Sequence, residues 1–357
     1  MHDGLHNKQR TMRNSNFELL RIIAIIMITA YHYVVHGEYT NNLPPPPDMY
    51  MKNVLDIGSL WGKAGVNLFS LIMGYYCIFS EELFFKKLIK LESTILQYTL
   101  GGLIFALLTR MHLSAGNIII SIFPVIFEHY WFITAYFIVY ILAPYINKCL
   151  KVLSQENYVK LSGVLMLFGS IIPFFTGRQT SGLFWNQLNW FIIMYIMGSY
   201  LRIYKPAYRK QVYVWTLVVC NVLLICSVLI ISKIANYIPV LSDYTVYFRW
   251  SNSPLVIVIC LCLMRIAEQT PVWNNNYINK FATLVIGIYL FQENVFFRDY
   301  LWGQLFINTS TSNSLFLIIH YSISVFLVCM LGAIVEYIRS YLVHSLSRLA
   351  RYDHCKQ

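Results

Sequence analysis

The sequence predicts an all-α integral membrane protein that crosses the bilayer about ten times. Three observations lead to this prediction: 57% of the 357 residues are hydrophobic, only 12% are charged and 16% are aromatic. Soluble domains carry about twice this share of charge, and aromatic rings are enriched where helices cross the two membrane interfaces. A soluble fold is therefore excluded.

Ten windows of the chain are long and apolar enough to cross a bilayer, which takes about 20 residues of helix. These windows lie at residues 17–36, 59–79, 88–109, 129–147, 161–176, 187–203, 212–232, 250–267, 281–298 and 314–337. A further apolar stretch, 117–127, is too short to span and contains Pro124. We expect it to lie at the interface or to re-enter the membrane. Residues 1–340 should form one membrane domain, and residues 341–357 a basic cytosolic tail.

The distribution of positive charge predicts how these spans are oriented. Cytoplasmic loops retain Lys and Arg, and 20 of the 27 Lys and Arg fall in the amino-terminal segment, in alternate loops and in the tail. Both termini should therefore face the cytosol. The remaining seven, expected on the outer side, are Lys52, Lys63, Arg110, Arg178, Lys233, Arg249 and Arg298.

Charge and cysteine patterns exclude several other classes of protein. The formal charge is +11, but the basic residues form short clusters between apolar runs and not one water-facing surface, so nucleic acid is not an expected partner. None of the eight cysteines forms a CxxC or zinc-ligand spacing. The polar amino terminus is followed by an apolar stretch that contains Arg21 and has no small-residue cleavage site, which predicts a retained first span.

The first span carries a polar stripe. Glu18, Arg21, Thr29, His32 and His36 fall on one helix face. Because such a face is costly in lipid, it should look into the bundle, with His32 about 16 Å beyond Arg21 at 1.5 Å per residue. Glu18 and Arg21 can also be read as a structural ion pair at the interface. A neutral imidazole is a common proton-transfer group, which makes His32 the first candidate for catalysis.

Several further polar groups fall at the same depth as His32. They are Asn67, Glu128, His129, Glu293, Asn294 and Arg298. Taken singly, each is more often a capping or interface residue than a catalyst. Helical spacing places Asn294 and Arg298 on one face and points Glu293 elsewhere.

The sequence offers no complete metal site. His32 and His36 have the i, i+4 spacing that can grip a metal ion, but no third ligand is identifiable, so no metal is expected. Towards the cytosol, Lys87 and Lys90 are i, i+3 neighbours at the entry to the third span. They can hold phosphates as paired point charges, or they can simply anchor the topology.

Five segments, in this order, resemble the integral-membrane acyltransferase family 3, which is best known from the O-acetylation of bacterial surface polysaccharides. The most specific are ELLRIIAIIMITAYH, from Glu18 to His32, and GIYLFQENVFFRDYLW, from Gly287 to Trp302. Between them lie three weaker matches, at residues 65–76, 129–147 and 190–201. The resemblance covers nearly the whole chain.

The chain departs from the family pattern at three places. It has Met73-Gly74-Tyr75 where relatives often have Ser-Gly-Tyr, and Lys87 and Lys90 where an Arg-x-x-Arg pair is common. Lysine keeps the charge of arginine but loses its bidentate fork. Gln292 stands where many relatives have a histidine, although the histidine of the first span is retained.

The resemblance implies a bacterial cytoplasmic-membrane enzyme of exopolysaccharide biosynthesis. Such an enzyme takes an acyl group, usually acetyl, from acyl-CoA on the cytosolic side and delivers it to a hydroxyl of an outer-face or lipid-linked glycan. Acetyl-CoA would then be held by Arg21, Lys87 and Lys90. His32 would act as general base or accept the acetyl group transiently, oriented by Glu128 or Glu293. The acceptor would contact Asn67, Trp131, Asn294 and Arg298.

Three other functions compete with the acyltransferase. A glycan or lipid flippase also needs internal polar groups, but its usual internal repeats are not found. A glycan polymerase would need larger outer loops. A structural scaffold would not explain why Arg21 and His32 lie within a membrane span, where ionisable residues are energetically costly. The sequence leaves open the acceptor sugar, the choice between acetyl and succinyl, and the oligomeric state.

Overall fold

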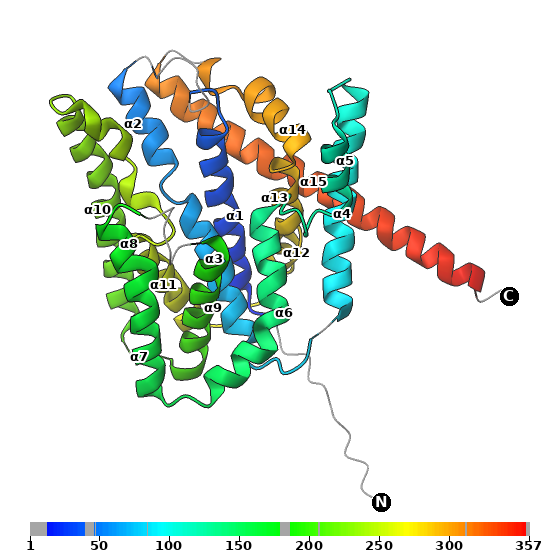
Figure 1. Cartoon of the computed structure of the whole chain (residues 1–357), viewed down its shortest axis with the longest axis horizontal. Helices are drawn as coiled ribbons and strands as arrows, with labels where there is room; N and C mark the ends of the chain where they lie inside the picture. The colour runs from blue at the N-terminus through cyan, green and yellow to red at the C-terminus, as the bar shows by residue number, and fades with distance from the viewer. Residues whose placement is uncertain are drawn as a thin grey trace, which may run out of the picture.

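The computed structural model describes residues 13–39, 46, 48–83, 85–178, 186–205, 208–310 and 313–354, and these residues form helices and connecting turns without any strand (Figure 1). The predicted all-α class is confirmed. Seven helical segments are long and apolar enough to cross a membrane, namely Ser15–Val35, Phe85–Leu108, Trp131–Lys151, Gln155–Phe175, Lys210–Ala235, Pro239–Gln269 and Ser314–Ser345. The chain is a multi-pass membrane protein. The full count of ten spans and the sides of the termini stay predictions.

Three expected spans do not meet that measure of length and hydropathy. Two of them correspond to single helices, α3 (Gly62–Cys77) and α9 (Gln187–Tyr204). The third, 281–298, is not one helix as the sequence suggested. It is divided into α12 (Asn276–Ala282), α13 (Val285–Gln292) and α14 (Val295–Tyr300). This division matters for function, because Glu293 and Asn294 lie at the break between α13 and α14.

Helix α1 (Ser15–Val35) runs through the centre of the bundle (Figure 1). It packs against α3 and α11 (Pro254–Gln269) on one side and against α12, α13 and α15 (Ser314–His354) on the other. The polar stripe predicted on the first span therefore faces protein, since Glu18, Thr29 and His32 are all buried. This position is what allows a histidine of α1 to meet residues from the far end of the chain.

Close contact between α3 and α9 depends on glycine. A Cβ atom added to Gly74 would lie 2.0 Å from the carbonyl oxygen of Tyr195, and one added to Gly198 would lie 2.1 Å from that of Leu71. The two backbones can approach only because neither residue has a side chain. Small residues serve the same purpose in membrane helix pairs generally. This pairing builds the wall against which α1 packs.

Polar caps start several of the helices where the sequence supplies Asn, Asp or Ser, whose side chains satisfy backbone N–H groups of the first turn. Asn14 begins α1, Asp48 begins α2 (Met49–Gly58) and Asn186 begins α9. Ser154 likewise begins α7 (Gln155–Met166), which continues through the π-helical segment η1 (Leu167–Ile171) into α8 (Ile172–Phe175). The remaining short helical turns are η2 (Pro239–Tyr244), η3 (Tyr247–Arg249), η4 (Leu301–Leu305) and η5 (Asn308–Ser310).

The outer ring of the bundle exposes apolar side chains. The apolar window of α10 (Lys210–Ala235) is only 17% buried, and that of α4 (Phe85–Leu108) is 28% buried, as expected of helices that face lipid. Helix α6 (Trp131–Lys151) is more enclosed. The apolar stretch 117–127 forms the short helix α5 (Ala115–Ile122) and a turn, so it does not span.

Helix α15 is the longest element of the chain. It passes the bundle and extends beyond α4, where it ends at His354 (Figure 1). At 1.5 Å per residue its 41 residues exceed the thickness of the hydrocarbon core, which is about 30 Å. The expected boundary between membrane domain and tail, at residue 340, falls inside this one helix. Residues 355–357 of the tail lie outside the described residues.

Candidate active site

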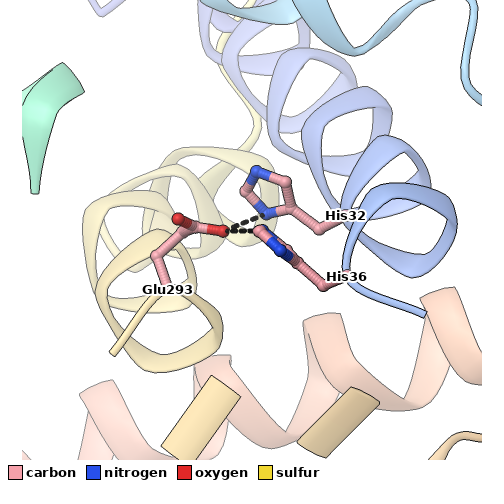
Figure 2. Close-up of side chains that lie close together, drawn as sticks. All are labelled: His32, His36 and Glu293. Atoms are coloured by element: carbon pink, nitrogen blue, oxygen red, sulfur yellow. Dashed lines mark hydrogen bonds and ion pairs between the residues drawn. The ribbon is translucent and has the colours of Figure 1, made fainter. Parts of the chain in front are cut away.

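His32, His36 and Glu293 meet at one point inside the bundle (Figure 2). The Nε2 atom of His36 lies 2.7 Å from Oε1 of Glu293, and Nδ1 of His32 lies 3.2 Å from the same oxygen. The two imidazole rings are one helical turn apart on α1, with centroids separated by 5.1 Å. One carboxylate oxygen is therefore shared by both histidines.

The break between α13 and α14 is what brings Glu293 to α1. Glu293 follows the last residue of α13, and Asn294 caps the first turn of α14 by accepting a hydrogen bond from the backbone N–H of Phe296. The amide group of Asn294 donates to the carbonyl oxygen of Tyr98 and to the hydroxyl of Tyr130, at 2.9 and 3.1 Å. Asn294 thus holds the break in place and is occupied by protein groups.

Burial makes the pairing of Glu293 energetically necessary. The exposed fraction is 9% for Glu293 and 8% for His32, and an ionised carboxylate removed from water costs several kcal/mol unless it is paired. Nδ1 of His32 lies 3.2 Å from this carboxylate without forming a hydrogen bond to it. The negative charge of Glu293 favours the tautomer of His32 that carries the proton on Nδ1. The lone pair of His32 then lies on Nε2, which can accept a proton or an acyl group.

Arg21 marks the opposite end of the polar stripe. Its guanidinium lies 3.2 Å from the carboxylate of Glu18, which also accepts a hydrogen bond from Arg13 at 2.7 Å. The structural ion pair considered from the sequence is therefore present. Arg21 also lines a cavity of about 170 Å³ whose other walls are almost all apolar. The cavity reaches Ile28, one helical turn before His32.

A second cavity, of about 500 Å³, opens at the same end of the bundle and contains the two lysines predicted to hold phosphates. Lys87, Lys90 and Arg339 line it together. Arg339 is fixed by two hydrogen bonds to the carboxylate of Glu336, at 2.6 and 2.7 Å. The two cavities share a wall formed by Leu91, Tyr136, Thr283 and Ile286. A basic entrance therefore adjoins an apolar passage that leads towards His32.

Comparison with known families identifies the class of protein to which this chain belongs. A family model described as an acyltransferase domain matches residues 14–335, which is nearly the whole chain. The chain belongs to acyltransferase family 3. No curated protein and no solved structure matches it. Family membership makes the protein a membrane acyltransferase.

In this acyltransferase a third cavity, of about 530 Å³, lies on the His32 side of the bundle. Trp131, Trp190 and Trp250 contribute to its walls, and Lys63 and Glu128 contribute charge. The ring of Phe132 stands between this cavity and the apolar passage, with its centroid 5.6 Å from that of Phe69, 5.8 Å from Phe191 and 5.3 Å from Tyr289. Phe69, Phe132 and Tyr289 line the apolar passage and Phe191 lines the third cavity, so the ring contacts run from one cavity to the other.

The site residues predicted from the sequence lie in several different parts of the structure. Glu293 contacts His32, whereas Glu128 is exposed at the wall of the third cavity and has a positive φ of 52°. Trp131 lines that cavity. Asn67 is buried behind it, accepting a hydrogen bond from Trp190 and donating to the carbonyl of Ser251.

Asn294 and Arg298, which the resemblance led us to expect at the acceptor, do not line the cavities. Asn294 is engaged at the α13–α14 break, and Arg298 lies 3.3 Å from Asp299 and lines none of the three cavities described above. The helix break falls before Asn294, and the backbone N–H of Arg298 still donates to the carbonyl oxygen of Asn294 at 2.7 Å. Asn294 is kept from the cavities by its role as the cap of α14. Glu293, which helical spacing pointed away from Asn294 and Arg298, contacts His32.

The donor atoms of His32, His36 and Glu293 also lie close enough to hold a metal ion, within 4.8 Å of one another. The sequence suggested no third ligand beside the two histidines, and Glu293 supplies one. Two histidines and one glutamate form a known catalytic zinc set. The distance of 2.7 Å between His36 and Glu293 is equally that of a direct hydrogen bond, whereas Nδ1 of His32 has no hydrogen-bond partner among the described residues.

Sequence reasoning missed two features of the acyltransferase. Glu336 and Arg339 lie three residues apart near the end of the last predicted span, where an ionisable residue is itself a signal of function. That rule identifies Glu336 directly. Lys63 was counted only as an outer-side charge, and no sequence pattern ties it to the third cavity.

Proposed function

We propose that the chain is an O-acyltransferase that moves an acyl group, acetyl in the first instance, from acyl-CoA to a hydroxyl of a cell-surface or lipid-linked glycan. The observation that carries the proposal is the pairing of His32 with the buried carboxylate of Glu293 at 3.2 Å, one helical turn beyond an apolar cavity that adjoins a cavity lined by basic residues. Membership of acyltransferase family 3 favours this function over the flippase, polymerase and scaffold alternatives.

The donor enters at the Arg21 end, which the excess of Lys and Arg in the same loops predicts to be cytosolic. Lys87, Lys90 and Arg339 bind the phosphates of the nucleotide, because three cations around one cavity offer charge-assisted hydrogen bonds to anionic oxygens. The acyl-pantetheine arm occupies the narrow apolar passage beyond them. Arg21 stands beside that passage and adds positive charge.

The acceptor enters from the opposite side through the cavity lined by Trp131 and Glu128. Flat aromatic walls with a few polar groups are typical of small-molecule sites. Donor and acceptor then approach His32 from opposite ends, separated by the aromatic rings around Phe132. Movement of that ring joins the two cavities.

His32 transfers the proton that the reaction must move. As general base, its Nε2 takes the proton of the acceptor hydroxyl while the oxygen attacks the thioester carbonyl, and the proton then passes to the departing CoA thiolate. In the second route Nε2 attacks the thioester carbonyl and CoA leaves as its thiolate. The acceptor hydroxyl then attacks the acyl-imidazole, His32 leaves as neutral imidazole, and the hydroxyl proton passes to the CoA thiolate. Glu293 stabilises the positively charged imidazole in both routes, as a carboxylate does in hydrolase triads.

The test is transfer of labelled acetyl from acetyl-CoA to glycan or lipid-linked sugar in membranes that contain the chain. We expect His32→Ala to abolish transfer with expression unchanged. His112→Ala is the matched control, because His112 is exposed in the turn between α4 and α5. Near-normal transfer by His32→Ala would show that His32 has no part in the mechanism. If the wild-type protein does not bind acetyl-CoA, acetyl-CoA is not the donor.

A further inference from the structure

The ring of Tyr31 is flanked by two cations at the His32 end of the bundle. Nζ of Lys63 lies 5.0 Å from the ring centroid, and the guanidinium carbon of Arg249 lies 5.4 Å from it. The ring of Tyr31 in turn lies 5.9 Å from that of His32. The side chain of Tyr31 therefore stands between these two positive charges and the proposed catalytic histidine.

Each cation is placed by contacts with the protein. Lys63 lies 5.5 Å from the ring of Trp131, a wall of the 530 Å³ cavity that Lys63 itself lines. Arg249 lies 5.8 Å from Trp250, another wall of that cavity, and donates a hydrogen bond to the hydroxyl of Ser59 at 2.8 Å. Aromatic faces attract cations, but they do not neutralise them.

Neither cation has a carboxylate within ion-pair distance among the described residues. The stretches 40–45 and 179–185, outside the described residues, contain no Asp or Glu. Glu128 lines the same cavity but is exposed and does not pair with Lys63. Two neighbouring like charges repel each other, and a partly buried site strengthens that repulsion. An anionic ligand relieves it.

The rest of the cavity suits a sugar. Asn186 and Gln187 supply amide groups, which can donate and accept hydrogen bonds to hydroxyls, and the tryptophan walls supply flat apolar faces. Stacking surfaces, amides and a concentrated positive charge together fit a sugar residue that bears an acidic group. A neutral sugar would leave the two cations without a counter-charge.

We propose that this cavity binds an anionic unit of the acceptor glycan, with a carboxylate or phosphate beside Lys63 and Arg249 and a sugar ring against the tryptophans. The proposal rests on the proposed function for the identity of the acceptor as a glycan, and it adds the charge of that glycan. Binding there places the acceptor beside Lys63, with the ring of Tyr31 between Lys63 and His32. Glu128, at the cavity wall, accepts hydrogen bonds from sugar hydroxyls.

The test is equilibrium binding of the purified full chain to matched probes in the absence of acyl-CoA. The probes are tetragalacturonate, its carboxyl-reduced neutral counterpart, a glucuronate-containing oligosaccharide with its own neutral counterpart, and a sugar phosphate with its dephosphorylated form. We expect an acidic probe to bind at least about tenfold more tightly than its neutral partner, since hydrogen bonds to charged groups are the strong ones. The carboxylate and phosphate arms distinguish the two sources of negative charge.

Variants decide whether Lys63 is responsible. Lys63→Gln should remove the preference for the acidic probe, Lys63→Arg should keep it, and Arg249→Gln should reduce it. Lys233→Gln is the matched control, because Lys233 is an exposed lysine in the last turn of α10. Equal binding of all acidic and neutral probes, or a preference that survives Lys63→Gln, would overturn the proposal. If the protein prefers acidic probes but transfers no acetyl group, the proposal of an anionic acceptor site stands and the proposal of acetyl-CoA as the donor is wrong.

Discussion

Glu293 accepts a hydrogen bond from His36 at 2.7 Å and lies 3.2 Å from His32 with the same oxygen. The carboxylate is thus positioned by one histidine and acts on another. His36 caps the carboxyl end of α1 and Glu293 lies at the α13–α14 break, so the contact joins residues 257 positions apart. The three residues form one hydrogen-bonded and ion-paired unit. Substitution of each one should lower the rate of acyl transfer by a different factor.

Glu293→Gln should lower acyl transfer by about 10²- to 10⁴-fold, the usual contribution of a positioned acid–base pair. The amide keeps the size of the side chain but removes the negative charge that stabilises imidazolium. Labelled acetyl transfer at saturating acetyl-CoA measures the effect. Glu156→Gln is the control, since Glu156 is exposed and pairs only with Lys160. Equal rates for the two variants would remove Glu293 from catalysis.

His36→Ala should lower transfer by about tenfold, because one hydrogen bond to a charged group is lost while Glu293 remains beside His32. Added to Glu293→Gln, the same change should cost almost nothing more, since residues that act through one another are not additive. The rates of the two single variants and the double variant form the measurement. Full additivity would show that His36 acts independently of Glu293.

The paired cations at the Arg21 end should govern affinity for acyl-CoA. Lys87→Ala with Lys90→Ala, or Arg339→Ala alone, should raise the dissociation constant by about tenfold as charge-assisted contacts to phosphate are lost. Lys86→Ala is the control, because Lys86 is exposed and does not line the cavity. If affinity is unchanged in the first two variants, these residues serve topology and not donor binding.

Gly74→Ala should destabilise the bundle by about 1–3 kcal/mol or prevent its folding, since overpacking forces backbones apart. The added methyl group would lie 2.0 Å from the carbonyl oxygen of Tyr195. Gly163→Ala, in α7, meets nothing within 4 Å and should be neutral or stabilising. Thermal unfolding of both variants in the same detergent makes the comparison. A stable Gly74→Ala protein would contradict the close approach of α3 and α9.

Chelation should leave acyl transfer intact. His36 and Glu293 are joined by a direct hydrogen bond, and the proposed steps use only His32 and the carboxylate. Transfer is measured after treatment with a strong chelator and dialysis, with metal content determined on the same sample. Loss of transfer that zinc restores would instead make His32, His36 and Glu293 a metal site.

The first helix shows what the local spacing of polar residues can predict. An α-helix repeats every 3.6 residues, so the steps from Glu18 to His32 define one face before any partner is known. The structure buries that face, as expected. The ninth predicted span shows the limit: hydropathy alone indicates a continuous segment, yet Asn294 caps a new helix and turns Glu293 towards α1. Helix caps inside apolar runs are weak signals in a sequence.

By itself the sequence determined the class of the molecule, a helical membrane protein of acyltransferase family 3, and the polar face of its first helix. Composition predicts the membrane class and helical period predicts the polar face, because each depends on neighbouring residues. The family follows from the ordered motifs and the family match. Only the tertiary structure decided that Glu293 and not Glu128 meets His32, and that Lys63 and Arg249 share the ring of Tyr31. Those contacts depend on how α1, α3 and the α13–α14 break pack together, and packing is a property of the whole bundle.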